Sequence, residues 1–304
     1  MTPAPVTSYD QLIDRAVALA AHGRRKRVAV AAAQDADVIG ALAEAEADGF
    51  IEATLFGDEP KIRSLAGENR SDLTHLTVVH EPDIMRATHA AVRLAAEKKA
   101  DIIMKGFLPT SAILKVVLDK QFGLRGANTL SHCAVLDIPG YHKLLNFTDG
   151  GMIVKPTVDQ KIQIIDNAAL VGRALGLSPV KVALSVVNTE QLLSDAARRV
   201  PNMLIDGPLS FELATSSSVK TKAGRGGSVA GDTDVYVVDS IEECNVVAKS
   251  LINFADAVFA GVIVGAKVPV SLVSRTDTVK NKLASLALAC LIAEYYAEPE
   301  GNRS

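Results

Sequence analysis

A hydroxyl, a guanidinium and a carboxylate stand close together near the carboxyl end of the chain, at Ser274, Arg275 and Asp277. They follow an apolar run, residues 261–270, and a helix-like run begins soon after them at Lys282. The pattern predicts a turn between a strand and a helix, and crevices at strand ends are where open α/β sheets bind ligands. A guanidinium can hold an anion in a fork, a hydroxyl can donate a hydrogen bond and a carboxylate can accept a proton. We therefore place the candidate catalytic group here.

A second polar segment follows the apolar run 101–104. Pro109 and Thr110 there are typical of a helix start, with Thr110 as a credible N-cap. The free amides and the dipole of such a start attract anions, and Lys115 lies about one turn further on. From the residues alone, an ordinary capped helix with a solvated lysine is the favoured interpretation.

A third segment places Arg125 between glycines, shortly before Ser131 and His132. An arginine in such a loop can reach a ligand, although surface loops often have this composition. His132 and Cys133 are neighbours on a predicted strand, so their side chains point to opposite faces and cannot easily form a nucleophilic pair. Cys290 falls at the core-facing spacing of a predicted helix, where a free thiol is usually inert.

Carboxylates gather at Asp232, Asp234 and Asp239, with an amide and an amine following at Asn245 and Lys249. Three carboxylates can suggest a divalent-metal site, but such a site needs further oxygen ligands on a shared face. The spacing is not specific enough to favour a metal over capping and turn carboxylates. We therefore predict no metal.

Apolar, β-rich runs alternate with runs of helical period along most of the chain. Alternation of this kind predicts βαβ units and a mainly parallel sheet, hence the α/β class. Ten such strands exceed one comfortable sheet, so two lobes are expected. The strand-like runs are residues 27–31, 52–56, 77–79, 101–104, 133–136, 144–147, 181–185, 202–205, 235–238 and 258–264.

Composition excludes several classes of protein. Hydrophobic residues make up 48% of the 304 residues, yet no apolar stretch reaches the ~18–20 residues of a membrane helix. The first residues lack a basic segment followed by an apolar core, which argues against a secretory signal. A net charge of −3 argues against a general nucleic-acid surface. Three scattered cysteines suit reduced thiols, and we expect a cytoplasmic protein with no nucleic-acid or membrane partner.

Several of these segments resemble the phosphate acetyl/butyryl transferase family, and its butyryltransferase-type branch most of all. The family's S-R-x-D-S-like turn and its K-L-x-S-x-A helix match the residues that begin at Ser274 and at Lys282. The resemblance runs from about Ala29 to Ala293 and is strongest in the final third. It implies two α/β/α lobes with mainly parallel sheets, an isocitrate/isopropylmalate dehydrogenase-like architecture and an active-site cleft between the lobes. The implied lobes are residues 1–128 with 265–304, and residues 129–264.

The resemblance also implies a role for each polar segment. Catalytic roles fall to Ser274, Arg275 and Asp277. Phosphate contacts fall to Thr110, Ser111, Lys115, Arg125 and Ser131, and contacts with coenzyme A or the substrate cleft to Asp234, Asp239, Asn245 and Lys249.

The role of Asp277 has two interpretations of equal weight. The carboxylate can serve as the base, or it can cap the last helix or orient Arg275. In the acetyl-type branch the proposed base lies six residues after the arginine, where this chain has Asn281.

The implied activity is the reversible conversion of a short-chain acyl-CoA and phosphate into acyl phosphate and CoA, by direct transfer in a ternary complex. Coenzyme A is then a substrate, no cofactor is bound permanently, and a homodimer or higher homo-oligomer is expected. Two alternatives stay open. A non-catalytic CoA or acyl-phosphate binding protein would account for departures from the family pattern at Lys115, Ile153, Cys244 and the shortened stretch 187–190. A metal- and NAD-dependent decarboxylating dehydrogenase would share the architecture.

Overall fold

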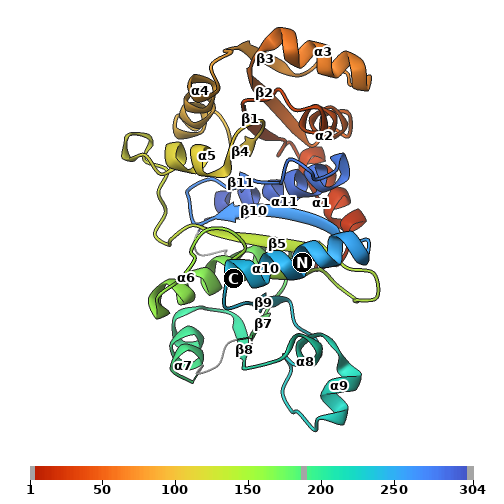
Figure 1. Cartoon of the computed structure of the whole chain (residues 1–304), viewed down its shortest axis with the longest axis vertical. Coiled ribbons are helices and arrows are strands. Elements are labelled where there is room, and N and C mark those ends of the chain that lie inside the picture. Colours follow the sequence, from red (N-terminus) through yellow and green to blue (C-terminus); the bar gives the residue numbers. More distant parts are fainter. Residues whose placement is uncertain (1–3, 186–189, 300–304) are drawn as a thin grey trace. The chain divides into compact units, whose positions relative to one another are not determined.

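The computed structural model describes residues 4–185 and 190–299 (Figure 1). Three residues of the shortened stretch, 187–189, lie outside this range. The chain divides into two compact units. The flanking unit consists of Asp10–Ala127 and Ala260–Ala297, and the mid-chain unit consists mainly of Asn128–Phe259.

The flanking unit is a mainly parallel sheet with helices on both faces. Its strands lie in the order β3-β2-β1-β4-β11-β10, and only β10 runs antiparallel to its neighbour. Helices α4 and α5 pack together on one side of this sheet, and α2 and α11 pack together on the other (Figure 1). The strands are β1 (Lys26–Ala31), β2 (Ile51–Gly57), β3 (Thr77–His80), β4 (Ile102–Lys105), β10 (Val258–Val264) and β11 (Val270–Ser271). The helices are α1 (Tyr9–Ala21), α2 (Ala36–Ala47), α3 (Glu59–Asn69), α4 (Ile84–Ala96), α5 (Thr110–Val117), the short 3₁₀ helix η1 (Lys120–Phe122) and α11 (Val279–Ala297).

The mid-chain unit has a second sheet section in the order β5-β6-β9-β7-β8. Strand β5 runs antiparallel to β6, and the remaining pairs are parallel. The strands are β5 (Ser131–Asp137), β6 (Leu145–Thr148), β7 (Val180–Leu184), β8 (Met203–Asp206) and β9 (Val235–Val237). The helices are α6 (Val158–Ala174), α7 (Glu190–Arg199), α8 (Phe211–Thr215), α9 (Ser217–Lys222) and α10 (Ile241–Phe254).

The predicted strand 258–264 is confirmed as β10, but the apolar run 261–270 is not a single strand that enters the turn, because it forms part of a hairpin. Strand β10 ends at Val264, and Gly265 follows with φ 98°, a left-handed conformation that favours glycine. The chain then returns as β11, whose Val270 pairs antiparallel with Ile263. Strand β11 therefore lies parallel to β4, and both strands end at the same edge of the sheet.

Helix α11 is buried on almost every side. From Asn281 to Ala293 each of its residues is buried, which explains why its sequence is apolar all round rather than on one stripe. Lys282 is a charged member of this buried set, with 1% of its surface exposed. A lysine is almost never fully buried unless its ammonium is paired, so the neighbours of Lys282 must account for its burial.

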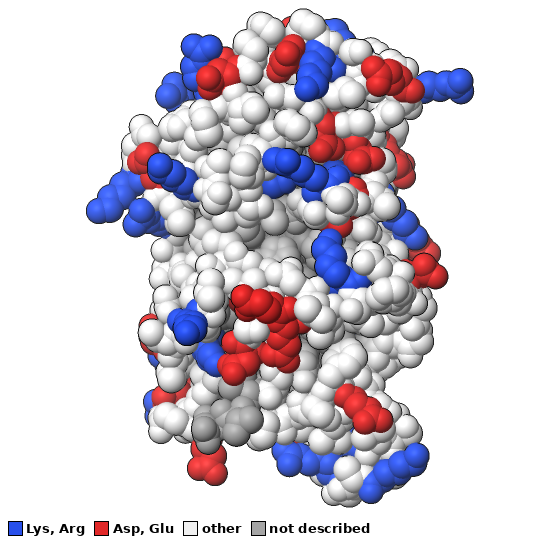
Figure 2. Space-filling model, viewed as in Figure 1, with Lys and Arg blue, Asp and Glu red and all other residues white. Residues whose placement is uncertain are grey.

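The structure gives two observations on surface charge and helix length. On the face drawn in Figure 2, charged side chains of both signs are scattered, and several acidic side chains form one compact group below the middle of the view. Within the described residues, no helix is both long enough and apolar enough to cross a membrane.

Candidate active site

The turn after β11 is closed by the side chain of Asp277. Its carboxylate accepts a hydrogen bond from the Ser274 amide at 2.6 Å, and the Asp277 amide donates to the Ser274 carbonyl at 3.3 Å. Asp277 is only 4% exposed, whereas Ser274 and Arg275 are exposed. The turn therefore presents a hydroxyl and a guanidinium to solvent and turns the carboxylate inward.

The end of β4 lies beside this turn and carries an exposed aromatic ring. The guanidinium carbon of Arg275 lies 5.1 Å from the centre of the Phe107 ring, and Lys61 Nζ lies 5.4 Å from it. Both distances are within the range of cation–π attraction, so Phe107 helps to hold Arg275. In the order β3-β2-β1-β4 the direction of chain progression reverses between β1 and β4, which is the position where such sheets bind ligands.

The ends of β1 and β4 approach each other closely. The amides of Gly106 and Phe107 donate to the carbonyls of Ala31 and Ala32 at 2.9 and 2.7 Å. A methyl group on Gly106 would lie 2.1 Å from the Ala32 oxygen. Only glycine allows the ends of β1 and β4 to come this close, and their closeness places Phe107 beside the turn.

Two buried lysines lie under the turn, and sequence reasoning assigned neither of them a role. Lys105 Nζ donates to the Val273 carbonyl at 3.3 Å, and Lys282 Nζ donates to the Asp277 carbonyl at 2.6 Å. Burial lowers the pKa of Lys105, and the nearby charge of Arg275 acts in the same direction, while Asp35 opposes it. The feature of the sequence that could have identified them is that each lysine lies within an otherwise apolar strand or helix.

The first turn of α5 is near the end of β4, as the sequence predicts, but its cap differs from the prediction. Pro109 is the N-cap, no side chain caps the helix, and Thr110 is the first helical residue. Thr110 is half-buried and Ser111 is exposed, so both are accessible beside free backbone amides. Lys115 is exposed in the last turn of the same helix.

Arg125 lies at the other edge of the flanking sheet. Its Nε donates to the Leu118 carbonyl at 2.7 Å, where α5 ends, and its backbone is bridged to Ala266. Ala266 follows the end of β10, which runs antiparallel to β11 and so points away from the turn at Ser274. The structure does not bring Arg125 together with Arg275.

In the mid-chain unit, the predicted residues divide between the two edges of the sheet section. Ser131 is fully buried, and its hydroxyl accepts a hydrogen bond from Asn167 Nδ2 at 2.9 Å. Asp239, after β9, pairs with Lys161 on α6 at 2.5 Å. Asn245 on α10 donates to the carbonyl of Gly150, which follows β6, at 3.3 Å. These positions share the edge at which the parallel strands end.

Lys249 lies elsewhere on α10. Its Nζ is 5.6 Å from the centre of the Phe259 ring, within the range of cation–π attraction. Phe259 is in the first part of β10 and is itself buried. The contact places the ammonium of Lys249 over a buried ring, and a role of Lys249 toward a substrate stays a prediction.

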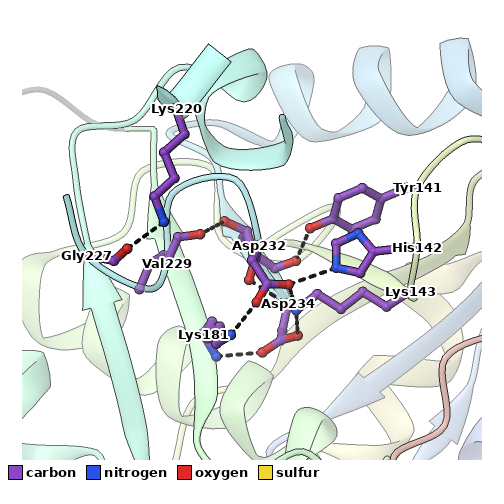
Figure 3. Close-up of polar contacts among 10 residues, drawn as sticks. Tyr141, His142, Lys143, Lys181, Lys220, Gly227, Val229, Asp232 and Asp234 are labelled. Atoms are coloured by element: carbon purple, nitrogen blue, oxygen red, sulfur yellow. Dashed lines mark hydrogen bonds and ion pairs between the residues drawn. The ribbon is translucent and has the colours of Figure 1, made fainter. Parts of the chain in front are cut away.

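Asp234 belongs to a polar cluster at the opposite edge, where β6, β7 and β9 begin (Figure 3). Its carboxylate accepts a hydrogen bond from the Lys181 amide at 2.7 Å and pairs with Lys143 Nζ at 2.5 Å. Asp232 pairs with Lys143, with Lys181 and with His142. Burial disfavours the charge of Asp232, but these hydrogen bonds hold its pKa well below the usual range. The cluster ties the beginnings of the strands together, away from Asp239.

The three cysteines are free and buried. Burial raises the pKa of Cys133 to about 12 and that of Cys244 to about 12, and it raises the pKa of Cys290 further still. Because the thiolate is the nucleophile, these thiols are poorly suited to attack a carbonyl at neutral pH.

Other binding features lie away from the turn. A pocket of about 400 Å³ is lined by Arg25, Arg27, Glu52, His75 and Thr77 among others, and none of the predicted site residues lines it. Among the described residues, no group of three or more His, Cys, Asp or Glu side chains is arranged to hold a metal ion.

The fold defines the class of protein. A branched-chain phosphotransacylase from Enterococcus faecalis V583, known from its crystal structure, matches with a TM-score of 0.77 and 30% sequence identity, covering 88% of this chain and 99% of that one. Phosphotransacylases share a dehydrogenase-like fold. The α/β class with a mostly parallel sheet and this architecture is therefore confirmed.

The sequence comparisons define the family. The model of the phosphate acetyl/butaryl transferase family matches residues 80–290. Phosphate butyryltransferase from Clostridium acetobutylicum is 36% identical over 281 residues, which cover 88% of this chain and 93% of that protein. Probable phosphate butyryltransferase from Bacillus subtilis is 37% identical over 286 residues, which cover 90% and 95%. The chain belongs to the phosphate acetyl/butaryl transferase family, and the prediction that it is an enzyme of that family is confirmed.

Proposed function

We propose that this protein interconverts a short-chain acyl-CoA and phosphate with acyl phosphate and CoA, by direct transfer while both substrates are bound. The observation that carries the proposal is the turn at Ser274, where an exposed hydroxyl and an exposed guanidinium lie beside the ends of β1 and β4. The family of the chain and the names of its relatives support the same reaction.

Arg275 stabilises charge during the transfer. In the direction of acyl-CoA formation, the CoA sulfur loses its proton and attacks the carbonyl carbon, the bond from that carbon to the phosphate oxygen breaks, and the departing phosphate takes the electron pair of that bond and, overall, one proton. The carbonyl oxygen gains negative charge in the transition state, and so does the phosphate oxygen whose bond to the carbonyl carbon is breaking. A preorganised donor is worth about 3 kcal/mol at such a position, and Ser274 adds a second donor beside it.

The geometry favours a structural role for Asp277 over that of a base. Its carboxylate is buried and accepts the Ser274 amide, so it holds the turn that presents Arg275. The CoA thiol has an intrinsic pKa near ~8.5 if it behaves like cysteine. A neighbouring guanidinium favours the thiolate, and we assign this effect to Arg275.

Phosphate contacts fall to the start of α5. Thr110 and Ser111 offer hydroxyls next to free amides, on the same edge of the flanking sheet as the turn. Lys115 adds a positive charge at longer range. Its ammonium is a point charge and lacks the bidentate geometry of an arginine guanidinium. Asp239, Asn245 and Lys249 remain our candidates for contact with CoA, which is a substrate here and not a resident cofactor.

Direct transfer predicts that the cysteines are dispensable. We expect Cys133→Ala and Cys290→Ala to keep activity within a few-fold of the unaltered protein, because both thiols are buried and their pKa values are raised by burial. Mass spectrometry after incubation with acyl-CoA alone should show no acylated protein. An acyl-cysteine adduct that forms and decays at the rate of turnover would show that transfer is not direct.

We test the function and its substrate range with a series of acyl phosphates and CoA, following the thioester product. Each buried methylene contributes ~0.8 kcal/mol, so neighbouring chain lengths should differ by only a few-fold. We expect activity on several short acyl groups with an optimum at three to five carbons, in line with the butyryl and branched-chain relatives. Specificity constants that fall steadily from acetyl to butyryl would overturn the chain-length assignment but leave the reaction class standing.

The same purified protein distinguishes acyl transfer from the other two functions considered, that of a non-catalytic binding protein and that of a dehydrogenase. A non-catalytic binding protein would bind CoA but form no thioester. A decarboxylating dehydrogenase would reduce a nicotinamide during turnover. We expect no change in nicotinamide absorbance.

A further inference from the structure

We propose that Lys105 and Lys282 are positioning residues, which fix the two ends of the turn 273–277 so that Ser274 and Arg275 are held ready for the transfer. The proposal rests on the proposed function, because it explains how that site is built. It adds two residues from parts of the chain to which no role has been assigned.

Lys282 holds the end of the turn from inside the fold. It is 1% exposed, and its Nζ donates to the main-chain oxygen of Asp277 at 2.6 Å. The same ammonium lies 4.0 Å from Asp35 Oδ1 and 3.7 Å from Asp37 Oδ2, at the start of α2. Asp35 is itself the N-cap of α2, where it accepts the Val38 amide at 3.0 Å. Lys282 therefore links the turn to a fixed helix end.

Lys105 holds the beginning of the turn. It is the last residue of β4, it is 5% exposed, and its Nζ donates to the Val273 carbonyl at 3.3 Å. It also approaches the Gly106 carbonyl at 3.5 Å. The two ammonium groups thus donate hydrogen bonds to main-chain oxygens on either side of Ser274 and Arg275. The Asp277 carboxylate closes the turn from within.

Stability alone does not account for Lys105. Taking an ammonium out of water costs several kcal/mol, and this cost is repaid only when the ammonium is well paired. Lys105 donates to neutral carbonyls, and its pKa is lowered by burial, so its charge is held at a cost to folding. Buried titratable groups with shifted pKa values are enriched at functional sites.

The test compares two methionine variants with a matched control on α11. Lys282→Met and Lys105→Met keep the length of the side chain and remove its donors. Lys280→Met changes an exposed lysine of the same helix. A displacement of about 1 Å in a reacting group costs about 10²-fold, so we expect kcat to fall by about that factor in the first two variants, with KM changed by less than about threefold. The control should keep its kcat and its urea midpoint. Lys282→Met leaves Asp35 and Asp37 without this ammonium and should unfold at a lower urea concentration, so kcat is compared where all three variants are folded.

A double-mutant cycle distinguishes positioning from a general structural effect. If Lys282 acts through the turn, then Lys282→Met should cost much less in a Ser274→Ala background than in the unaltered protein. If the two fold-reductions in activity simply multiplied in the double variant, the proposal would be contradicted. It would also be contradicted by kcat values within twofold of the unaltered protein in both methionine variants.

A readout independent of activity keeps the proposal separate from the proposed function. The Ser274 and Asp277 amides are hydrogen-bonded within the turn, so hydrogen–deuterium exchange of that peptide reports its order. We expect exchange there to be at least about tenfold faster in Lys282→Met and unchanged in Lys280→Met. Unchanged exchange in Lys282→Met overturns the positioning role even if the protein transfers no acyl group. Faster exchange in an inactive protein would instead count against the function.

Discussion

Replacing Arg275 with alanine should lower kcat by about 10²- to 10³-fold, which is the usual cost of removing one donor that meets developing charge. The guanidinium is exposed and rests on the Phe107 ring, so it contributes little to the core. The free energy of unfolding should therefore change by less than about 1 kcal/mol. Steady-state kinetics and urea unfolding on the same preparations measure both quantities.

The matched control for this variant is Arg93→Ala, which removes an exposed arginine from α4 in the same unit. We expect the control to keep normal kinetics. Near-normal turnover of a folded Arg275→Ala variant would remove Arg275 from the mechanism, and Arg275→Lys would then have no reason to differ from the unaltered protein.

Replacing Gly106 with alanine should destabilise the fold and the site together. The new methyl group would lie 2.1 Å from the Ala32 oxygen and 2.7 Å from the Ala31 oxygen, so one strand end must move. Overpacking of this kind costs about 1–3 kcal/mol or more, because backbone atoms cannot rotate away. Since Lys105 and Phe107 flank Gly106, kcat should fall in the fraction that remains folded.

Gly67→Ala gives the matched comparison for Gly106→Ala. Gly67 lies in α3, and a methyl group there would meet nothing within 4 Å. Alanine in a helix is favoured over glycine by about 0.5–1 kcal/mol, so this variant should unfold at a higher urea concentration. A Gly106→Ala variant as stable as the unaltered protein would show that the ends of β1 and β4 do not approach as closely as described.

Local patterns were sufficient to predict most of the fold. The apolar runs of β1 and β4 and the all-round apolar sequence of α11 each follow from their own composition. The run 258–264 was predicted correctly as a strand, whereas the interpretation of 261–270 as one strand that enters the turn was wrong, because Gly265 and Pro269 interrupt the run and β11 pairs back on β10. Thr110 was predicted as an N-cap for its hydroxyl, but the preceding proline takes that position.

The site was predictable only where its residues are neighbours in the chain. Ser274, Arg275 and Asp277 come from one turn, so their spacing was sufficient to locate them. Lys105 and Val273 are 168 residues apart in the sequence, and their contact depends on β11 lying next to β4. Strand order of that kind is set by tertiary packing, and a single sequence does not encode it in any local pattern.

The measurement that tests the central claim most directly is the phosphate-dependent release of CoA from butyryl-CoA by the purified protein. The account predicts that a free thiol appears only when phosphate is present, with one acyl phosphate formed for each CoA released, and that the rates of formation of both products fall together in Arg275→Ala. Release of CoA at the same rate without phosphate, or release with free butyrate instead of acyl phosphate, would contradict it.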